Sequence, residues 1–361
     1  MSKKKNNLLI AASGTGGHIF PALSIAEDIE KKWNISWLGV EQRCESELVP
    51  KKYHLFRLKV KAPTKKNIFL SFQYLKVILS TLSVVRIILK ERINLVFTTG
   101  GYISAPAILA SKILGVPIIL HESNLVPGTV TKYFGSMCNY ILTGFSETID
   151  FLNSNKAVYT GTPLREQFYS RHKLPDWVPV SSKPLVLVMG GSQGAKGVND
   201  MFDASLGFLL SANFRIIHLI GDTNKKKIDS KNKSNYIQVH FTNDMANLMQ
   251  NCDLVISRAG AGTINELIAV RKPSILIPYP GSKNNHQERN ALVLSSIGGA
   301  IIINQSAKAD LFLNKTLKRI FSKNRKNKYE ILDLMQKNMS QFKSNKSKNE
   351  IIKFINYFLK N

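Results

Sequence analysis

The sequence predicts an α/β protein of two domains, each containing a parallel sheet. Short apolar runs rich in β-branched residues alternate with helical patterns along most of the chain, which is typical of βα repetition. The chain has 361 residues, more than one hydrophobic core usually serves, and its 44% hydrophobic content can fill two cores. A connector at 165–183, rich in charges and prolines, separates two series of such runs and marks the expected domain boundary.

The first half opens with the apolar run Leu8–Ala12, which we interpret as a strand because it is too short for the core of a signal peptide. A glycine turn at 13–18 leads from it into a helix, with Pro21 expected in the first turn of that helix. Further strands of the first domain are predicted at Ile35–Val40, Leu55–Val60, Leu95–Thr99, Val116–His121 and Tyr140–Thr143.

The second half repeats this alternation after the connector. Its strands are predicted at Leu185–Met189, Arg215–Ile220, Tyr236–Phe241, Leu254–Ile256, Ser274–Ile277 and Ala300–Ile303. The tail is Lys-rich and helical, and its last segment is amphipathic, so it must dock on an apolar surface. We therefore expect a first domain at 1–164, a second at 165–345, and a helix at about 346–361 that packs back on the first domain.

The chain is strongly basic, with a net charge of +26 from 50 Lys and Arg against 24 Asp and Glu. Such an excess favours nucleic acid, anionic lipid or acidic substrates as partners. A nucleic-acid binder would interleave basic with aromatic residues, whereas the Lys-rich runs here carry Asn and Ser, so no nucleic acid is expected. Three separated cysteines, Cys44, Cys138 and Cys252, predict a reduced, cytoplasmic protein without structural zinc.

Residues 68–90 form a long helical pattern that combines apolar and basic side chains. Lys76 and Arg86 interrupt it, so no uncharged run approaches the ~20 residues that a transmembrane helix needs. Two interpretations stay open. In one, the apolar side packs in the core and the charges are solvated. In the other, the stretch from Lys65 to Lys90 is an apolar and basic patch that sits on anionic lipid.

Glycine-rich turns follow three predicted strands, at Gly14–Gly17, Gly190–Gly194 and Gly260–Gly262, and a glycine pair stands at Gly100-Gly101. Backbone amides and the positive end of a helix dipole at such turns suit an anionic group such as phosphate. Close packing of a helix on a strand is the competing interpretation of each single turn. Glu266 lies one helical turn beyond the third of them, where its carboxylate can accept two hydrogen bonds from a cis-diol such as ribose.

Two familiar nucleotide motifs are absent from the sequence. The dinucleotide fingerprint Gly-x-Gly-x-x-Gly would need glycine at the position of Ile19, and no Gly-x-x-x-x-Gly-Lys-Ser/Thr run occurs. Both a dehydrogenase and a P-loop enzyme are therefore disfavoured.

His18 lies at the expected start of the first helix, beside Gly16 and Gly17. The positive end of the helix dipole disfavours an imidazolium there, which leaves a neutral imidazole able to accept a proton. His18 is thus the candidate general base, and a capping or core histidine is the alternative. The segment His121–Asn124 offers polar groups at the same edge of the sheet, although it could simply form a turn. The Arg165 guanidinium could reach a diphosphate, and a surface arginine without such a role is the alternative.

Five motifs occur in a fixed order along the chain: Gly14–Ala22, Gly100–Pro106, His121–Asn124, Gly190–Ala195 and Ser257–Ala261. Together they resemble the bacterial MurG family of N-acetylglucosamine transferases, and the likeness runs nearly from end to end. The resemblance implies the GT-B fold, in which two Rossmann-like domains with parallel sheets face each other across a deep cleft. It places the donor mainly on the second domain and the lipid acceptor on the first.

The resemblance also implies roles for individual residues. Glu266 would bind the ribose hydroxyls, Ser192 the diphosphate region and Thr242 the uracil side. Arg165, Gln287 and Asn124 would contact the sugar and phosphates. The full set expected to bind UDP-N-acetylglucosamine is Thr15, Gly16, Gly17, Asn124, Arg165, Ser192, Thr242, Ala261, Gly262, Thr263, Ile264, Asn265, Glu266 and Gln287.

The chain lacks an Asp-x-Asp sequence, by which many glycosyltransferases hold a divalent metal on a nucleotide diphosphate. We expect neither a metal nor a cofactor, and backbone amides and Arg165 would replace the metal's charge. The chain departs from the family pattern at a few positions: Gly262 replaces Leu, Thr162 replaces Asn, Thr242 replaces an aliphatic residue and His286 replaces Gln.

The function implied by the resemblance is inverting transfer of N-acetylglucosamine from UDP-N-acetylglucosamine to the 4-hydroxyl of the muramyl sugar of lipid I. The product would be lipid II, and the enzyme would sit peripherally on the cytoplasmic face of the membrane, in contact with anionic lipid. Two alternatives stay open: a related GT-B transferase that uses another lipid, such as diacylglycerol, and a non-catalytic UDP-sugar-binding protein at the membrane.

Overall fold

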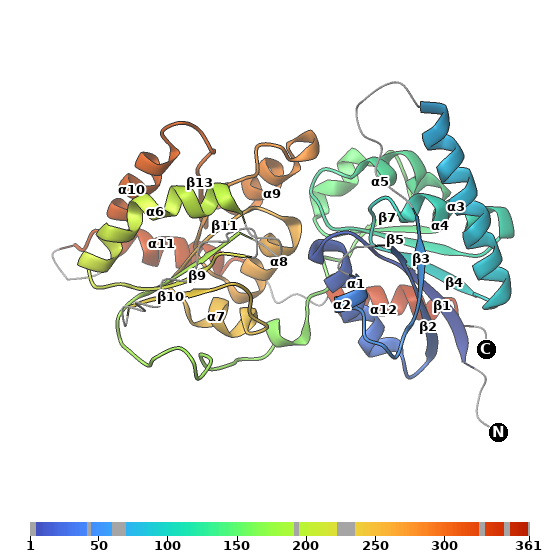
Figure 1. The fold of residues 1–361 in the computed structure, drawn as a ribbon, viewed down its shortest axis with the longest axis horizontal. Coiled ribbons are helices and arrows are strands. Elements are labelled where there is room, and N and C mark those ends of the chain that lie inside the picture. The colour runs from blue at the N-terminus through green and yellow to red at the C-terminus, as the bar shows by residue number, and fades with distance from the viewer. Residues whose placement is uncertain are drawn as a thin grey trace. The chain divides into compact units, whose positions relative to one another are not determined.

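The computed structural model describes residues 5–41, 45–59, 70–190, 195–221, 235–324, 329–342 and 347–359. They form two compact units, one comprising Met1–Arg165 with Asn345–Asn361 and the other Glu166–Ser344. Each unit has a single sheet in which all strand pairs are parallel, with helices packed against it (Figure 1). The predicted α/β fold with one parallel sheet in each half is confirmed.

The first unit contains a seven-stranded sheet in the order β3-β2-β1-β4-β5-β6-β7. Its strands are β1 (Asn6–Ala11), β2 (Trp33–Val40), β3 (His54–Leu58), β4 (Leu95–Thr98), β5 (Ile118–Glu122), β6 (Tyr140–Thr143) and β7 (Ala157–Tyr159). Its helices are α1 (Gly16–Ile29), α2 (Glu45–Leu48), α3 (Leu70–Lys90), α4 (Ser104–Leu114), α5 (Thr129–Phe134) and α12 (Ser347–Tyr357), with 3-10 turns at Gly135–Met137 and Ser146–Phe151.

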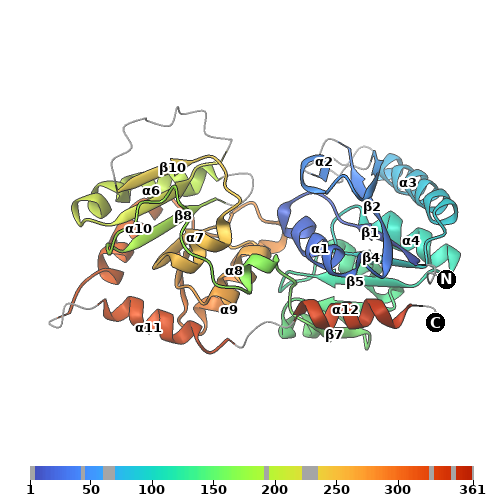
Figure 2. The same ribbon diagram turned by 90° about the horizontal axis from the view of Figure 1, so that it is seen from below.

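Both faces of this sheet are covered, and the alternation of side chains along β1 shows it. Leu8 and Ile10 belong to a core that includes residues of α1 and α12, whereas Leu9 and Ala11 belong to a core with residues of α3 and α4. Successive residues of a strand point to opposite faces, so the uninterrupted apolar run at 8–12 is what a sheet buried on both sides requires. In Figure 2 the red helix α12 lies with the strands and helices of the first unit, and contacts between α12 and α1 show that the two helices pack together.

The second unit contains a six-stranded sheet in the order β10-β9-β8-β11-β12-β13. Its strands are β8 (Leu185–Met189), β9 (Arg215–Leu219), β10 (Tyr236–Val239), β11 (Leu254–Ser257), β12 (Ser274–Leu276) and β13 (Ala300–Ile302). Its helices are α6 (Lys196–Ser211), α7 (Met245–Asn251), α8 (Ala261–Val270), α9 (His286–Ser295), α10 (Ala309–Ile320) and α11 (Glu330–Met339), with 3-10 turns at Glu166–Phe168 and Lys283–Asn285. Apolar residues of α6, α10 and α11 share one core with inward-facing residues of β8, β11 and β12.

Two details of the first unit differ from the predictions. Pro21 is the sixth residue of α1, so its expected place in the first turn was wrong. The helix begins earlier, at Gly16, because Thr15 forms its N-cap and the Thr15 carbonyl accepts hydrogen bonds from the His18 and Ile19 amides at 3.0 and 3.2 Å. The strand β7 was not predicted, because three residues are too few for the alternation of side chains to be recognised.

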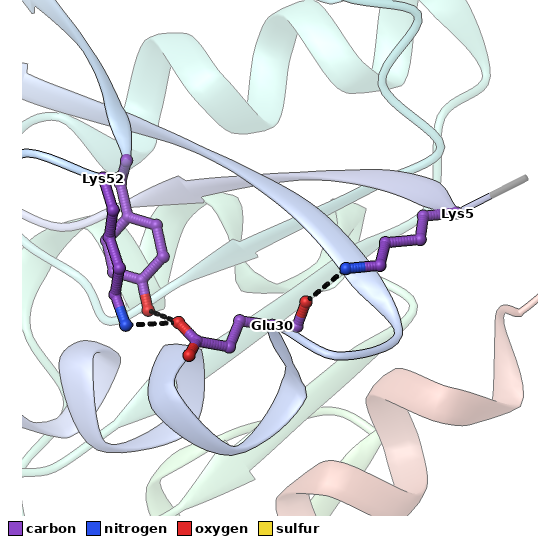
Figure 3. Close-up of polar contacts among 4 residues, drawn as sticks. Lys5, Glu30 and Lys52 are labelled. Atoms are coloured by element: carbon purple, nitrogen blue, oxygen red, sulfur yellow. Dashed lines mark hydrogen bonds and ion pairs between the residues drawn. The ribbon is translucent and has the colours of Figure 1, made fainter.

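A polar cluster joins the end of α1 to neighbouring segments of the chain (Figure 3). The Glu30 carboxylate forms an ion pair with Lys52 and accepts a hydrogen bond from the Tyr53 hydroxyl at 2.7 Å, while Lys5 donates to the Glu30 carbonyl at 3.0 Å. Hydrogen bonds from Lys52 and Tyr53 lower the pKa of Glu30. Both side chains are partly exposed to solvent, so we expect the ion pair to orient the segment before β3 rather than to add much stability.

Each unit also buries one histidine in neutral form. His121, at the end of β5, contacts the Gly161 carbonyl through Nε2 at 3.0 Å. His218, in β9, contacts the Tyr236 hydroxyl and the Asn199 Oδ1 oxygen, both at 3.0 Å. Desolvation of the buried ring lowers the pKa of each to about 4.

These two histidines should make the protein less stable in mild acid. The unfolded chain protonates them below about pH 6.5 while the folded chain keeps them neutral to about pH 4, so the free energy of unfolding falls as the pH drops through that interval. At pH 5 each buried histidine should lower the free energy of unfolding by roughly 2 kcal/mol relative to pH 7. Urea unfolding at both pH values should show a smaller loss in His218→Gln than in the parent protein, and equal losses would contradict the assignment.

Candidate functional site

The strand order of each sheet places two strands side by side that each precede a predicted glycine turn. In the first unit β1 lies between β2 and β4, and Ala11 pairs with Thr98, so the turn after β1 and the Gly100-Gly101 pair after β4 leave the sheet side by side. In the second unit β8 and β11 are neighbours, and Met189 pairs with Ser257. Ligands of open α/β sheets bind at such points, outside the carboxyl ends of the strands.

The turn after β1 prepares the start of α1 for an anion. Gly14 has φ of +102°, a conformation that a side chain disfavours, and it directs the chain from the strand into the helix. Thr15 is exposed, and Gly16 and Gly17 form the first helical positions, where amides have no partner within the helix. The predicted residues Thr15, Gly16 and Gly17 thus form one helix start.

Glu45 supports this turn from within the unit. Its side chain is buried, and Oε1 accepts a hydrogen bond from the Gly14 amide at 3.0 Å. The Gly39 backbone approaches the Glu45 side chain so closely that an added Cβ would lie 3.2 Å from its Cγ. Sequence reasoning missed Glu45, because its only signal is an acidic residue in an otherwise ordinary short helix.

His18 is half-buried at the third position of α1, and its ring lies against the turn after β4. Nδ1 is 2.7 Å from the Thr99 carbonyl oxygen, and the Thr99 hydroxyl donates to the His18 carbonyl at 2.9 Å. A Cβ added to Gly100 or Gly101 would lie 3.5 to 3.7 Å from atoms of the imidazole. The candidate base therefore has a defined position in the first unit.

Asn124 is held by the buried carboxylate of Glu122, the last residue of β5. Glu122 Oε1 accepts hydrogen bonds from the Asn124 amide and side chain, both at 3.0 Å, and Oε2 accepts from the Gly128 amide at 2.9 Å and the Thr131 hydroxyl at 2.6 Å. One carboxylate thus fixes the loop between β5 and α5 and orients the Asn124 side chain. Arg165, the last residue before the second unit, places its guanidinium over the Phe20 ring, 4.6 Å from the ring centre.

In the second unit the predicted donor residues of α8 divide between two faces. Gly260 is the N-cap, and the half-buried Gly262, Thr263 and Glu266 share one side of the helix. Ile264 is fully buried, and the Asn265 side chain donates to the Ala261 carbonyl at 2.9 Å inside the unit. Only the backbone of Ile264 and Asn265 can therefore face a ligand.

The loop after β12 is fixed by Gln287 and Arg258. Gln287 Oε1 accepts a hydrogen bond from the Tyr279 amide at 2.9 Å. Arg258, at the end of β11, is buried and donates to the Ile277 and Pro278 carbonyls at 3.1 Å and to Gln305 Oε1 at 2.8 Å. Desolvation lowers the pKa of its guanidinium. Because these N–H groups bind protein oxygens, Arg258 joins the ends of the strands around the predicted donor turn.

Of the remaining predicted residues, Thr242 takes part in a turn and Ser192 lies outside the described residues. The Thr242 hydroxyl accepts a hydrogen bond from the Asp244 amide at 3.0 Å and donates to the Asp244 carboxylate at 3.3 Å, so it forms the turn before α7. Ser192 and its glycine neighbours in the predicted turn at 190–194 lie outside the described residues, apart from Gly190. Within the described ranges, no group of three or more His, Cys, Asp or Glu side chains is arranged to hold a metal ion.

Comparison with known proteins decides the family. Residues 8–143 match the glycosyltransferase family 28 N-terminal domain and residues 185–353 its C-terminal domain. The chain is 60% identical, over 99% of both chains, to the UDP-N-acetylglucosamine–N-acetylmuramyl-(pentapeptide) pyrophosphoryl-undecaprenol N-acetylglucosamine transferase of Prochlorococcus marinus strain MIT 9215. The crystal structure of Acinetobacter baumannii MurG matches 98% of this chain and 100% of its own, with a TM-score of 0.76 and 25% identity. The chain belongs to the MurG family.

Membership of the MurG family confirms the resemblance inferred from the five motifs and the GT-B class of the fold. A second relative, from P. marinus strain MIT 9211, carries the same enzyme name and is 44% identical over 92% of this chain and 94% of its own. Glu45 holds the turn after β1, Glu122 holds the loop that carries Asn124, and Arg258 holds the loop after β12.

Replacing Glu122 by glutamine should loosen the loop that carries Asn124. The amide group would turn an N–H toward the Gly128 amide or the Thr131 hydroxyl, so at least one buried donor loses its acceptor at a cost of about 1–3 kcal/mol. Hydrogen exchange at the amides of Asn124 and Gly128 should accelerate by a matching factor. The matched control is Glu147→Gln, because Glu147 is exposed in the 3-10 turn at Ser146–Phe151. Unchanged exchange in Glu122→Gln would contradict the proposed support.

Proposed function

We propose that this protein transfers N-acetylglucosamine from UDP-N-acetylglucosamine to the muramyl sugar of lipid I, which yields lipid II for peptidoglycan synthesis. The observation that carries the proposal is the 60% identity over 99% of the chain with a transferase of that name. The two glycine-lined strand junctions, one in each unit, supply the kind of anion site that a nucleotide diphosphate and a polyprenyl diphosphate need.

The donor binds the second unit in this proposal. The carboxylate of Glu266 accepts hydrogen bonds from the two ribose hydroxyls, one helical turn from the start of α8. Backbone amides at Ala261, Gly262 and Thr263, together with Ser192, receive the diphosphate. Gln287 and Asn124 contact the sugar, and Thr15, Gly16 and Gly17 complete the contact. Thr242 is assigned to the uracil side, where its turn with Asp244 would place backbone rather than its hydroxyl against the base.

The reaction is a single displacement with inversion. The 4-hydroxyl oxygen of the muramyl sugar bonds to the anomeric carbon while the bond from that carbon to the UDP oxygen breaks, and UDP leaves with the electron pair. His18 takes the proton from the attacking hydroxyl. The charge that develops on UDP falls on the amides of the glycine turns and on Arg165, whose planar guanidinium suits two phosphate oxygens.

The enzyme associates with the membrane surface through α3. None of the helices in the described part of the chain combines the length and the apolar character of a membrane span. One side of α3 exposes Leu75, Ile78, Leu79, Leu82 and Leu89, with Lys76, Arg86 and Lys90 also exposed. Buried Val84 and Ile88 occupy the other side, so that face packs in the core and the exposed face is available for the proposed lipid contact. Lys65 and Lys66 lie outside the described residues.

Removing apolar surface from α3 should weaken membrane association. In Ile78→Ser/Leu79→Ser the partition coefficient on vesicles with anionic lipid should fall roughly tenfold or more, because each buried leucine-sized side chain contributes about 1.5–3 kcal/mol. Flotation assays measure this, and Phe312→Ser, on exposed α10 of the second unit, serves as the control. Charge reversal at Lys65, Lys66 and Arg86 should act in the same direction. Flotation that none of these changes affects would rule out α3 as the contact.

An acceptor comparison separates the proposal from a related lipid transferase. Radiolabelled UDP-N-acetylglucosamine is supplied with lipid I or with diacylglycerol in the same mixed micelles. We expect label in the lipid I product alone. Label in diacylglycerol would indicate the related transferase, and UDP-sugar binding without transfer to either lipid would indicate a non-catalytic sensor.

A further inference from the structure

We propose that the turn Thr99–Gly101 is a tautomer lock, which holds His18 with its proton on Nδ1 and leaves Nε2 as the proton acceptor. The inference rests on the proposed role of His18 as general base, and it adds what makes that histidine competent. It assigns positioning roles to Thr99, Gly100 and Gly101, none of which was among the residues expected to act in the reaction.

The hydrogen bond of Nδ1 determines the tautomer. Nδ1 of His18 lies 2.7 Å from the carbonyl oxygen of Thr99, and a carbonyl can only accept. Nδ1 therefore carries the hydrogen, and in a neutral imidazole Nε2 then carries the lone pair. A base that takes a proton from a hydroxyl needs that free lone pair, so the bond to Thr99 selects the reactive form before substrate binds.

The side chain of Thr99 forms a second hydrogen bond with His18. The Thr99 hydroxyl donates to the His18 carbonyl oxygen at 2.9 Å, so both the ring and the backbone of one residue are tied to the other. Thr99 is buried, which shields both bonds from competing water. The two residues are 81 positions apart and meet because β1 pairs directly with β4.

The glycine pair packs against the His18 ring and sets the orientation of the Thr99 carbonyl. Gly100 and Gly101 have φ of +87° and +79°, in the region that favours glycine. A Cβ on Gly100 would lie 3.5 Å from Cε1 and 3.7 Å from Nδ1, and one on Gly101 would lie 3.7 Å from Cδ2 and Nε2. These distances are ordinary contacts, so an alanine would fit. What it would disturb is the backbone, and through it the orientation of the carbonyl.

His121 provides an internal reference with the opposite tautomer. Its Nε2 lies 3.0 Å from the Gly161 carbonyl, so the same reasoning places the hydrogen on Nε2, and Nδ1 accepts from the Ser123 hydroxyl at 3.3 Å. One protein thus contains both forms in neighbouring parts of one unit, and a single spectrum can distinguish them.

The first test reads the tautomer directly. Nitrogen-15 spectra of the histidine-labelled full-length protein at pH 8, with assignments from His18→Gln and His121→Gln, should show a protonated Nδ1 for His18 and a protonated Nε2 for His121. A protonated Nε2 on His18 would overturn the proposal. This readout needs no turnover, so it stands even if transfer to lipid I fails.

The second test measures kcat for two variants that each place alanine at a position of positive φ. Gly100→Ala is compared with Gly115→Ala, because Gly115 also has positive φ, +67°, but has nothing within 4 Å of an added Cβ and caps the end of α4. We expect kcat with lipid I to fall on the order of 10- to 100-fold in Gly100→Ala only, with KM for UDP-N-acetylglucosamine little changed. Equal kcat values in the two variants would overturn the proposal.

A third comparison isolates the threonine hydroxyl. Thr99→Val keeps the branched shape and removes the bond to the His18 carbonyl, whereas Thr99→Ser keeps the hydroxyl. We expect Thr99→Val to lower kcat and to broaden or shift the His18 ring signals, and Thr99→Ser to restore both. A purely structural role for the Thr99 hydroxyl would lower the melting temperature of Thr99→Val and leave the His18 signals unchanged, and that result would contradict the positioning role of the hydroxyl.

Discussion

His18→Ala should lower kcat for transfer to lipid I by about 10²- to 10⁴-fold and leave the dissociation constant of UDP-N-acetylglucosamine nearly unchanged. General base catalysis by a positioned side chain contributes a factor of that size. The ring lies in the first unit, between the glycine turn after β1 and the pair after β4, where the acceptor is proposed to bind. Its loss therefore removes proton transfer and leaves the donor contacts of α8 intact.

The measurement is the initial rate at saturating concentrations of both substrates, with donor affinity measured separately by calorimetry. Retention of most of the kcat in His18→Ala would remove the base assignment. Loss of donor binding together with kcat would instead point to a positioning role of the ring.

Glu266→Ala should weaken donor binding by roughly 2 to 5 kcal/mol, or about 30- to several-thousand-fold in the dissociation constant. The estimate reflects the loss of two hydrogen bonds from ribose hydroxyls to a charged acceptor. Glu266 stands on the half-buried side of α8 together with Gly262 and Thr263, one turn from the helix start at Ala261. The backbone amides that would receive the diphosphate are unaffected by the change.

A comparison of UDP with 2′-deoxy-UDP makes this prediction specific. The parent protein should bind UDP more tightly than the deoxy analogue, and Glu266→Ala should bind both alike, because the hydroxyl has lost its acceptor. Asp333→Ala, which removes an exposed carboxylate from α11, controls for the change in net charge. An unchanged UDP dissociation constant in Glu266→Ala would refute the ribose contact.

The strands were predictable wherever an apolar run was long enough to show its pattern. The run at 8–12 became β1 and the run at 185–189 became β8, because strands buried on both faces need continuous apolar sequence. The three-residue β7 has no such signal. The helix α1 begins at Gly16, two residues before the expected start at His18, because the Thr15 carbonyl accepts the first hydrogen bonds of the helix.

The glycine turns were also predictable, whereas the residues that support them were not. Glu45 binds the Gly14 amide, Thr99 binds His18, and Arg258 binds Gln305, across 31, 81 and 47 positions of sequence. Each contact depends on which strands are neighbours, and local sequence patterns carry no information about strand order. The opposite error occurs at Ile264 and Asn265. The whole segment 261–266 was predicted to bind the donor, but the side chains of these two residues point into the interior of the unit.

The most direct test of the proposed activity is the structure of the product. Purified protein is incubated with lipid I and UDP-N-acetylglucosamine, and the disaccharide is released and examined by mass spectrometry and proton NMR. We predict a β-linked N-acetylglucosamine on the 4-oxygen of the muramyl sugar, formed with release of one UDP for each sugar transferred. An α linkage, attachment at another oxygen, or release of UDP without a disaccharide product would contradict the inverting transfer proposed for this protein.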